Sequence, residues 1–256
     1  MKNKKIIILG GKGESTNIVF HALNKSIGIN LVILEEKESI KIFIKRRIKR
    51  LGLSTVIGQI LFQVSICRLL KIISRKRIAE IINTNDLNIK EIPSNKIQHV
   101  SSINSKASIE LINKINPDLI IVNGTRIISK KVLQSANCKF INTHAGITPM
   151  YRGVHGAYWA LVNEDLYNSG VTVHFVDEGI DTGNIIAQAR INHTSKDNFT
   201  TYPLLQLSVG IGLLIKSIQQ YFDNSIALLK ENGESNLYYH PTIWQYVYNR
   251  VTKKVK

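Results

Sequence analysis

Short runs of branched apolar residues alternate along the chain with stretches in which apolar residues recur every three or four positions. The short runs predict buried strands, and they lie at 5–9, 30–35, 118–122, 139–142 and 171–176. The stretches with helical spacing lie at 17–23, 108–116, 130–134, 156–163 and 200–224. Strands that alternate with helices are typical of a doubly wound α/β fold, so we expect a mostly parallel sheet of at least five strands. The last helix is expected to pack across this sheet.

The segment 41–80 interrupts the alternation, because a compact α/β unit does not need so long an insertion after its second strand. Residues 51–67 carry no charge and are flanked by basic clusters on both sides. A helix that spans a bilayer needs about 20 strongly apolar residues, and polar side chains interrupt this stretch at Ser54, Thr55, Gln59, Gln63 and Ser65. We therefore expect a helical hairpin that covers the core with a solvated basic face. A peripheral contact with an anionic membrane surface is the alternative.

The chain of 256 residues is long enough to bury a core, and its length favours one main domain. We expect this domain over 1–230, with 41–80 as a basic helical insertion. A short appendage over 231–256, rich in aromatic and basic residues, is expected to follow. The first apolar run ends after four residues at Gly10, which predicts a strand rather than a signal peptide.

The two cysteines, Cys67 and Cys138, lie far apart and match no metal-ligand spacing. Free thiols are usual in a reducing compartment, so we expect a cytoplasmic protein without a metal site. If 41–80 contacts a membrane, the expected location is the inner face of that membrane.

Positive charge is concentrated in two segments of the chain. Residues 41–80 contain eleven Lys or Arg residues and one acid, Glu80, and four more cations lie over 250–256. An anionic partner is therefore expected to meet a local basic patch. The sequence has no RNA-binding signature such as an aromatic-rich sheet motif, so a small-molecule partner is favoured over nucleic acid.

The first candidate for chemistry is Asn142-x-His144, at the end of a predicted strand. Ligands of open parallel sheets bind beyond the carboxyl ends of the strands. Because side chains two positions apart on a strand share a face, both groups are expected to point the same way. An amide and an imidazole together can stabilise an oxyanion or move a proton near neutral pH. In isolation, the pair is better explained by a turn-capping Asn and a packed His.

The second candidate is the loop that follows the strand at 171–176. It contains three carboxylates, those of Asp177, Glu178 and Asp181, and such a cluster has no use in core packing. One of them could lie against His144 and raise its pKa, or accept a proton through water. A solvated acidic turn is the structural alternative.

Taken together, these segments resemble the formyltransferase family. The family includes glycinamide ribonucleotide transformylase, methionyl-tRNA formyltransferase and the nucleotide-sugar N-formyltransferases. The likeness rests on two motifs, Asn142-x-His144 with Pro149-x-Tyr151-Arg152-Gly153, and Gly170-Val-Thr-Val-His174-Phe-Val with Asp181-x-Gly183. It covers residues 110–190 well and residues 1–35 loosely. The resemblance implies a Rossmann-like fold, and N10-formyltetrahydrofolate as the formyl donor.

The resemblance also implies roles for individual residues. The family's catalytic Asn, His and Asp fall on Asn142, His144 and Asp181. The implied mechanism is attack of a primary amine on the formyl carbon, with Asn142 and His144 holding the oxyanion. Asp181 would keep His144 suitably charged or relay the amine proton through water. The implied folate pocket consists of Arg126, Ile127, Ile128, Asp177, Glu178, Gly179 and Ile180.

The acceptor of the formyl group is a separate question. Gly11, Lys12 and Gly13 follow the first strand and open a helix, so their amides can cradle a phosphate. A plain strand-to-helix turn explains them equally well. Further substrate contacts are expected from Tyr151, Arg152 and Gly153.

A nucleotide-linked amino sugar is the expected acceptor. The basic segment 41–80 suits a diphosphate, and the aromatic tail over 238–246 suits a base or a sugar face. About seventy residues after the second motif are too few for the RNA-binding domain of the methionyl-tRNA enzymes, which disfavours a tRNA acceptor. The open alternatives are glycinamide ribonucleotide transformylase, hydrolysis of the donor, and a folate- or nucleotide-sugar-binding protein without turnover. A homodimer also stays open.

Overall fold

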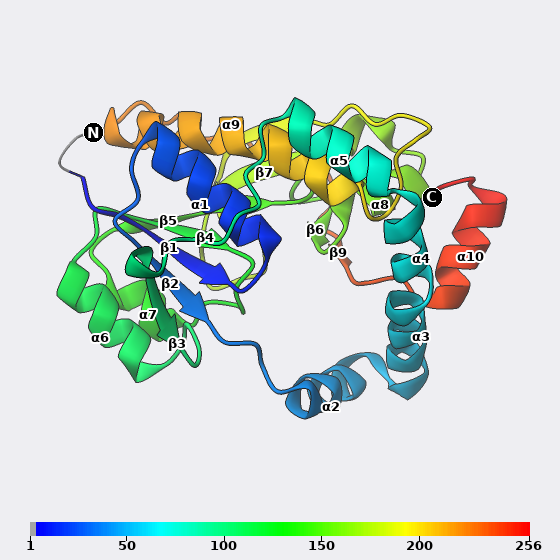
Figure 1. Ribbon diagram of the computed structural model, residues 1–256, viewed down its shortest axis with the longest axis horizontal. Coiled ribbons are helices and arrows are strands. Elements are labelled where there is room, and N and C mark those ends of the chain that lie inside the picture. The colour runs from blue at the N-terminus through cyan, green and yellow to red at the C-terminus, as the bar shows by residue number, and fades with distance from the viewer. Residues whose placement is uncertain (1–3) are drawn as a thin grey trace.

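A seven-stranded sheet forms the centre of the molecule in the computed structural model, which describes residues 4–256 (Figure 1). The strand order is β3-β2-β1-β4-β5-β7-β8. The strands are β1 (Ile6–Gly11), β2 (Leu31–Glu35), β3 (Ile97–Val100), β4 (Leu119–Asn123), β5 (Lys139–His144), β7 (Gly170–Phe175) and β8 (Ile185–Arg190). The first five run parallel, whereas β7 is antiparallel to both of its neighbours. The predicted doubly wound, mostly parallel sheet is therefore confirmed.

Helices cover both faces of this sheet (Figure 1). Alternate residues of β1 point to opposite faces of the sheet and pack against different helices. Ile6 and Ile8 pack with α1 (Glu14–Ser26) and α9 (Tyr202–Phe222), and Ile7 and Leu9 pack with α6 (Lys106–Ile115) and α7 (Lys130–Ser135). A strand that is buried on both faces needs an unbroken apolar run, which is why the central strands are readable from the sequence.

The position of a ligand site follows from the strand order. From β1 the chain first builds β2 and β3 on one side, and then returns to add β4 and β5 on the other. In open α/β sheets, ligands bind at such a switch point, outside the carboxyl ends of the strands. Here that place is the junction between the ends of β1 and β4. A side chain at Gly11 would collide with the Gly124 carbonyl, so the two loops touch there.

The predicted helix over 200–224 is confirmed as α9, which packs on β7, β8 and α1. The structure adds two strands, β3 and β8, to the five predicted ones. It also contains a small second sheet, in which β6 (Arg152–Gly153) pairs with β9 (Leu237–Tyr238). Two 3-10 turns complete the secondary structure, η1 (Ser94–Lys96) and η2 (Leu166–Asn168).

The insertion folds as four consecutive helices rather than as one hairpin. They are α2 (Ile40–Leu51), α3 (Leu53–Val64), α4 (Ile66–Ile73) and α5 (Arg75–Thr84). Gly52, with a φ of 83°, separates the first two, because a left-handed backbone ends a helix. Phe62, Cys67 and Ile81 enter a cluster shared with α8 (Gly156–Val162) and α9, whereas α2 buries no residue. The insertion thus covers part of the core, as expected, and α2 projects beyond it.

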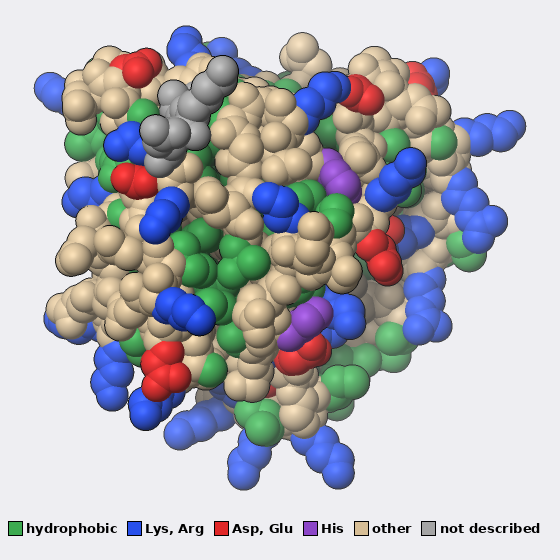
Figure 2. All heavy atoms as spheres, turned by 60° about the vertical axis from the view of Figure 1, so that its left-hand side comes forward, with side chains coloured by type: hydrophobic (Ala, Val, Ile, Leu, Met, Phe, Trp, Pro, Cys, Tyr) green, Lys and Arg blue, Asp and Glu red, His purple; other side chains and the backbone are tan. Residues whose placement is uncertain are grey.

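The predicted appendage packs on the main body. Its helix α10 (Ile243–Thr252) lies against α3, and Tyr246 belongs to the same buried cluster as Phe62. The Trp159 indole donates a 2.9 Å hydrogen bond to the Tyr239 carbonyl. Residues 231–256 are therefore integrated through the insertion and through α8. Around the face shown in Figure 2, Lys and Arg side chains project at the margin.

Candidate active site

Asn142 and His144 lie at the carboxyl end of β5, two positions apart, and line one cavity of about 470 Å³. The cavity lies at the carboxyl ends of β4 and β5, next to the β1–β4 junction at which the strand order predicts a site. A volume of this size is typical of sites for small organic ligands, about 300–1,000 Å³. The expectation that the amide and the imidazole reach the same space is therefore met.

Asp181 reaches the same cavity although β7 is antiparallel. The carboxyl end of β7 lies beside Ile141, so the loop after it must fold back to approach His144. It does so with Asp181 in the left-handed region, at a φ of 53°, which non-glycine residues rarely adopt. Asp181 Oδ2 lies 3.3 Å from His144 Nδ1 and accepts a 3.0 Å hydrogen bond from the Gly153 amide.

The three groups have distinct electrostatic surroundings. Burial alone would raise the pKa of Asp181, but His144, His174 and the Gly153 amide together hold it at about 2. Asp181 is therefore ionised at neutral pH. Burial lowers the pKa of His144, against the opposing effect of the Asp181 carboxylate.

Both ring nitrogens of His144 face oxygen atoms. Nε2 lies 2.7 Å from the Tyr151 carbonyl oxygen, and Nδ1 faces Asp181. Each neutral tautomer can donate to only one of these acceptors, whereas an imidazolium donates to both. A proton taken up by His144 is therefore stabilised from two sides.

His174 is the site residue to which the sequence assigned no role. It pairs with Asn142 across β5 and β7, and its Nε2 lies 3.1 Å from Asn142 Nδ2. Its Nδ1 lies 2.7 Å from the Phe175 carbonyl oxygen, which can only accept, so Nδ1 carries a proton. In the neutral ring Nε2 then accepts from the Asn142 amide, and in the charged ring Nε2 faces Asp181 Oδ1 at 3.7 Å. One N–H of Asn142 is thereby fixed, and the second N–H is left for a ligand.

The residues assigned to a folate pocket divide into two groups. Those that line the 470 Å³ cavity are Arg126, Ile127, Ile128, Asp177, Gly179 and Ile180. Glu178 is not among the lining residues, and its carboxylate lies 3.0 Å from Lys130 Nζ. The Asp177 side chain accepts hydrogen bonds from Gly179 and Thr182 within its own loop, so it shapes the loop rather than the cavity surface.

The residues assigned to the acceptor also divide. Gly11 and Lys12 line a second cavity of about 670 Å³, whereas Gly13 caps α1 outside it. Gly153 lines the first cavity. Tyr151 is buried, and its hydroxyl donates to Asp165, so its side chain supports the wall from behind. Arg152 donates a 3.1 Å hydrogen bond to the Ile180 carbonyl and holds the loop that carries Asp181.

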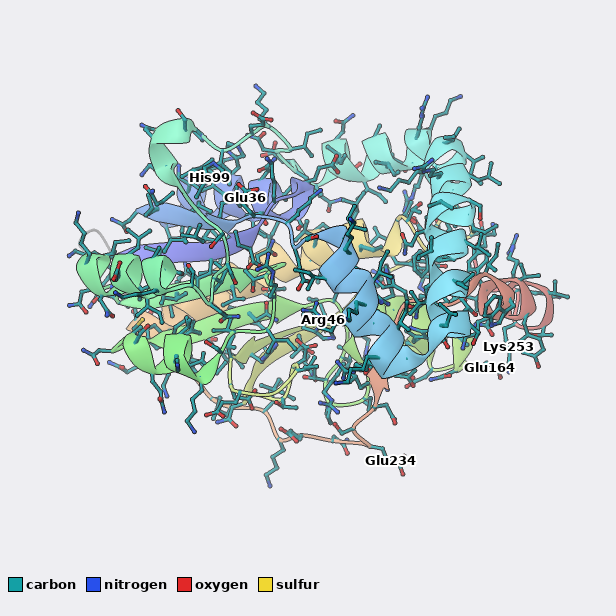
Figure 3. The ribbon with its side chains drawn as sticks, turned by 90° about the horizontal axis from the view of Figure 1, so that it is seen from below. Glu36, Arg46, His99, Glu164, Glu234 and Lys253 are labelled. Carbon is teal, nitrogen blue, oxygen red and sulfur yellow. The ribbon has the colours of Figure 1, made fainter. Side chains whose placement is uncertain are left out.

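The two cavities adjoin. They share Gly124, Thr125, Arg126 and Ile127, which follow β4 at the switch point. The second cavity is closed on its far side by α2, which supplies Phe43, Arg46 and Arg50. In Figure 3, which shows the molecule from below, α2 lies toward the viewer and carries Arg46. Within residues 4–256, no group of three or more His, Cys, Asp or Glu side chains is placed to hold a metal ion.

An amide, an imidazole and an ionised carboxylate grouped beside the switch point of a doubly wound sheet suit the chemistry of an α/β enzyme that transfers an acyl group. The sequence profile described as "Formyl transferase" matches residues 69–203, more than half of the chain. The protein therefore belongs to the formyl transferase family, which indicates a transferase. N10-formyltetrahydrofolate is the formyl donor of this family.

Curated relatives include two methionyl-tRNA formyltransferases. The protein from Thermodesulfovibrio yellowstonii is 34% identical over 127 residues, which cover 49% of this chain and 41% of that protein. The protein from Clostridium tetani is 32% identical over 154 residues, which cover 59% and 47%. The alignments thus span less than half of the length of each curated relative.

Solved structures share the fold at lower identity. A 4-N formyltransferase from Francisella tularensis aligns with a TM-score of 0.55 and 21% identity, over 92% of this chain and 76% of that one. A phosphoribosylglycinamide formyltransferase from Streptococcus pneumoniae aligns with a TM-score of 0.55 and 19% identity, over 86% and 99%. At these identities the likeness establishes the Rossmann-like fold, and the acceptor has to be argued from the site.

Proposed function

We propose that the protein transfers the formyl group of N10-formyltetrahydrofolate to the primary amine of a nucleotide-linked amino sugar, in the cytoplasm. The observation that carries the proposal is that the cavity lined by Asn142, His144 and Asp181 adjoins a second cavity at Gly124–Ile127. One has the size and the apolar walls that a folate ring needs, and the other has the charge and the aromatic group that suit a nucleotide.

The 470 Å³ cavity suits the donor. Val122, Ile128 and Val176 give it apolar walls, and the loop over 177–181 brings backbone amides and carbonyls to its rim. These groups would hold the flat ring of the donor, with Ile127, which is 57% exposed, at the mouth. Once bound, the donor supplies an activated formyl carbon.

The residues of the chain then have separate tasks. The free N–H of Asn142 stabilises the negative charge that develops on the formyl oxygen as the amine attacks. Asp181, ionised at neutral pH, orients His144 and stabilises the positive charge while His144 carries the amine proton. That proton would pass to N10 of the leaving tetrahydrofolate as the N10–formyl bond breaks.

His174 is expected to act as a positioning residue, because it fixes the orientation of the Asn142 amide. His174→Phe is expected to lower kcat about fivefold with little change in KM for the donor, since it removes one hydrogen bond worth about 1 kcal/mol. Steady-state kinetics on both substrates measure this. His99→Phe, at an exposed histidine of β3, is the control and should leave kcat unchanged. An equal loss in the two variants would remove His174 from the site.

The 670 Å³ cavity suits an anionic acceptor with a flat group. Five cationic side chains line it against three acidic ones, so its balance is positive. Arg46 is paired with Glu38 at 2.9 Å and Arg126 with Glu35 at 3.7 Å, which leaves Lys12, Lys37 and Arg50 as the candidates for phosphate contacts. Phe43, which is 40% exposed, offers a face for stacking on a base or a sugar.

Lys12→Ala and Arg50→Ala are expected to raise KM for the acceptor about tenfold each, because each removes one charged contact worth 1.5 kcal/mol or more. The value of kcat and KM for the donor should stay within about twofold. Lys45→Ala is the matched control, since Lys45 lies on the same helix as Arg50 but outside the cavity lining. If Lys45→Ala weakens acceptor binding as much as Arg50→Ala, the cavity is not the acceptor site.

An aminoacyl-tRNA acceptor is the second candidate, because the curated relatives described above are methionyl-tRNA formyltransferases. Glycinamide ribonucleotide is the third, from the name of the Streptococcus pneumoniae structure. A panel of amino-sugar nucleotides, methionyl-tRNA and glycinamide ribonucleotide separates the three. Turnover of glycinamide ribonucleotide alone, or of methionyl-tRNA alone, would overturn the sugar proposal and leave formyl transfer in place.

A further inference from the structure

A stripe of exposed apolar side chains runs along α3. Leu53, Ile57, Ile60, Leu61 and Val64 are each between 41% and 58% exposed, and they follow one another at helical spacing. The stripe continues on α4, where Leu69, Ile72 and Ile73 are 55–65% exposed. An apolar stripe of this length is unusual on a soluble protein surface.

The opposite face of these helices is fixed to the protein. Phe62 is fully buried, and Gln59 donates a 2.6 Å hydrogen bond to the His240 carbonyl. The stretch Leu53–Ile73 has the length and the mean hydropathy, 1.7, of a membrane span. Crossing a bilayer would break the buried contacts of its inner face. The helices therefore stay packed on the protein, and only their outer apolar face can contact a membrane.

Helix α10 widens the stripe into a surface. Its Trp244, Val247, Tyr248 and Val251 are 48–72% exposed and also follow helical spacing. The Trp244 ring lies over Gly58 so closely that a side chain there would collide with it, which places α10 beside α3. We call the exposed apolar side chains of these helices the α3–α4–α10 surface. It lies at the end of the molecule opposite α6 and α7 (Figure 1).

Cations border the α3–α4–α10 surface. Arg50, Arg68 and Lys71 are exposed on the inserted helices, and Arg250 is exposed on α10. Between α2 and α5 the only acidic residue is Glu80, and α10 contains none. Lys253, at the end of α10, is paired with Glu164 (Figure 3). An apolar face with a basic border matches the apolar interior and the anionic headgroups of a membrane surface.

We propose that the α3–α4–α10 surface docks the folded protein on an anionic lipid bilayer, with the helices lying in the plane of the headgroups. A second copy of the chain fits less well, because a two-fold contact would bring two basic borders together. Since α2 joins α3 through Gly52 and also closes the 670 Å³ cavity, docking places that cavity next to the membrane surface. The inference does not depend on which acceptor is used.

Co-sedimentation of the full chain with lipid vesicles tests the proposal. The protein is expected to sediment with vesicles that contain phosphatidylglycerol, and to stay in the supernatant with phosphatidylcholine alone. The double variant Leu61→Glu, Leu69→Glu is expected to lower partitioning at least tenfold, because it places two charges in the apolar interface. Ile89→Glu with Leu228→Glu is the matched control, since these residues are 45% and 49% exposed but lie outside the surface. Equal binding of the two double variants would overturn the proposal.

A second variant tests the charge border and does not depend on the apolar substitutions. Arg68→Glu with Lys71→Glu is expected to lower partitioning about tenfold at low salt, and less at high salt. Thermal unfolding checks that each variant remains folded. Fluorescence should shift to shorter wavelength on anionic vesicles as Trp244 leaves water. Two results would overturn the proposal. The wild-type protein could fail to bind either vesicle type, or it could form dimers that Leu61→Glu dissociates.

Discussion

Asn142→Ala, His144→Ala and Asp181→Asn are each expected to lower the rate of formyl transfer about 10²–10³-fold while the fold stays intact. Asn142→Ala removes the donor to the developing oxyanion. His144→Ala removes the proton acceptor, and Asp181→Asn removes the carboxylate that orients His144. Asparagine is chosen at position 181 because it tolerates the left-handed backbone there, at a φ of 53°. The absorbance change on tetrahydrofolate formation measures the rate.

Asp86→Asn is the control for the last of these variants. Asp86 has almost the same backbone conformation, with a φ of 49°, but it is exposed and pairs with Lys25 away from both cavities. The two Asp→Asn substitutions therefore differ only in their place in the fold. The control should retain wild-type turnover. Near-normal turnover in any of the three site variants would remove that residue from the proposed mechanism.

Arg77→Ala is expected to destabilise the protein by about 3 kcal/mol, because it leaves a buried carboxylate without its cation. Arg77, on α5, donates two hydrogen bonds of 2.9 and 3.0 Å to Asp197, whose side chain is inaccessible to solvent. For a chain of this size the expected fall in midpoint is about 6–12 °C, measured by thermal unfolding. Glu80→Ala removes the exposed partner of Arg77 and should shift the midpoint by less than about 2 °C.

The same pair gives a pH dependence. Burial opposes ionisation of Asp197, but Arg77 and Thr194 outweigh it and lower its pKa below the usual value. A lowered folded pKa stabilises the protein above the unfolded pKa of about 4, and that stability is lost as pH falls through the folded pKa. The difference between wild type and Arg77→Ala should therefore shrink below about pH 4. A constant difference down to pH 2 would show that Arg77 stabilises α5 by packing alone.

The site was only partly readable from the sequence. Asn142 and His144 follow the two-residue period of a strand, and Asp181 stands in a loop whose carboxylates have no packing use. His174 gave no such signal, because its role depends on the antiparallel register of β5 and β7, which pairs it with Asn142. Glu178 was assigned with its neighbours, yet its side chain turns to Lys130, since a tight loop cannot point every carboxylate inward.

The fold was readable where a strand is buried on both faces. The edge strand β3 has two exposed residues among its four, so its apolar pattern is too short to distinguish it from a loop. The strand β8 becomes more exposed toward its end, for the same reason. The insertion was predicted as helical from composition. The position of α2 beside the second cavity could not be predicted, because it depends on long-range contacts. Local spacing carries no information about such contacts.

The central claim is that Asn142, in the cavity that adjoins the acceptor cavity, takes part in formyl transfer to an amine. The direct measurement is tetrahydrofolate formation from N10-formyltetrahydrofolate, with and without a panel of nucleotide-linked amino sugars, in wild type and Asn142→Ala. The account predicts turnover that requires an amino sugar, gives a formylated product by mass spectrometry, and falls about 10²–10³-fold in the variant. Tetrahydrofolate formation at the same rate without any amine, or unchanged in Asn142→Ala, would contradict it.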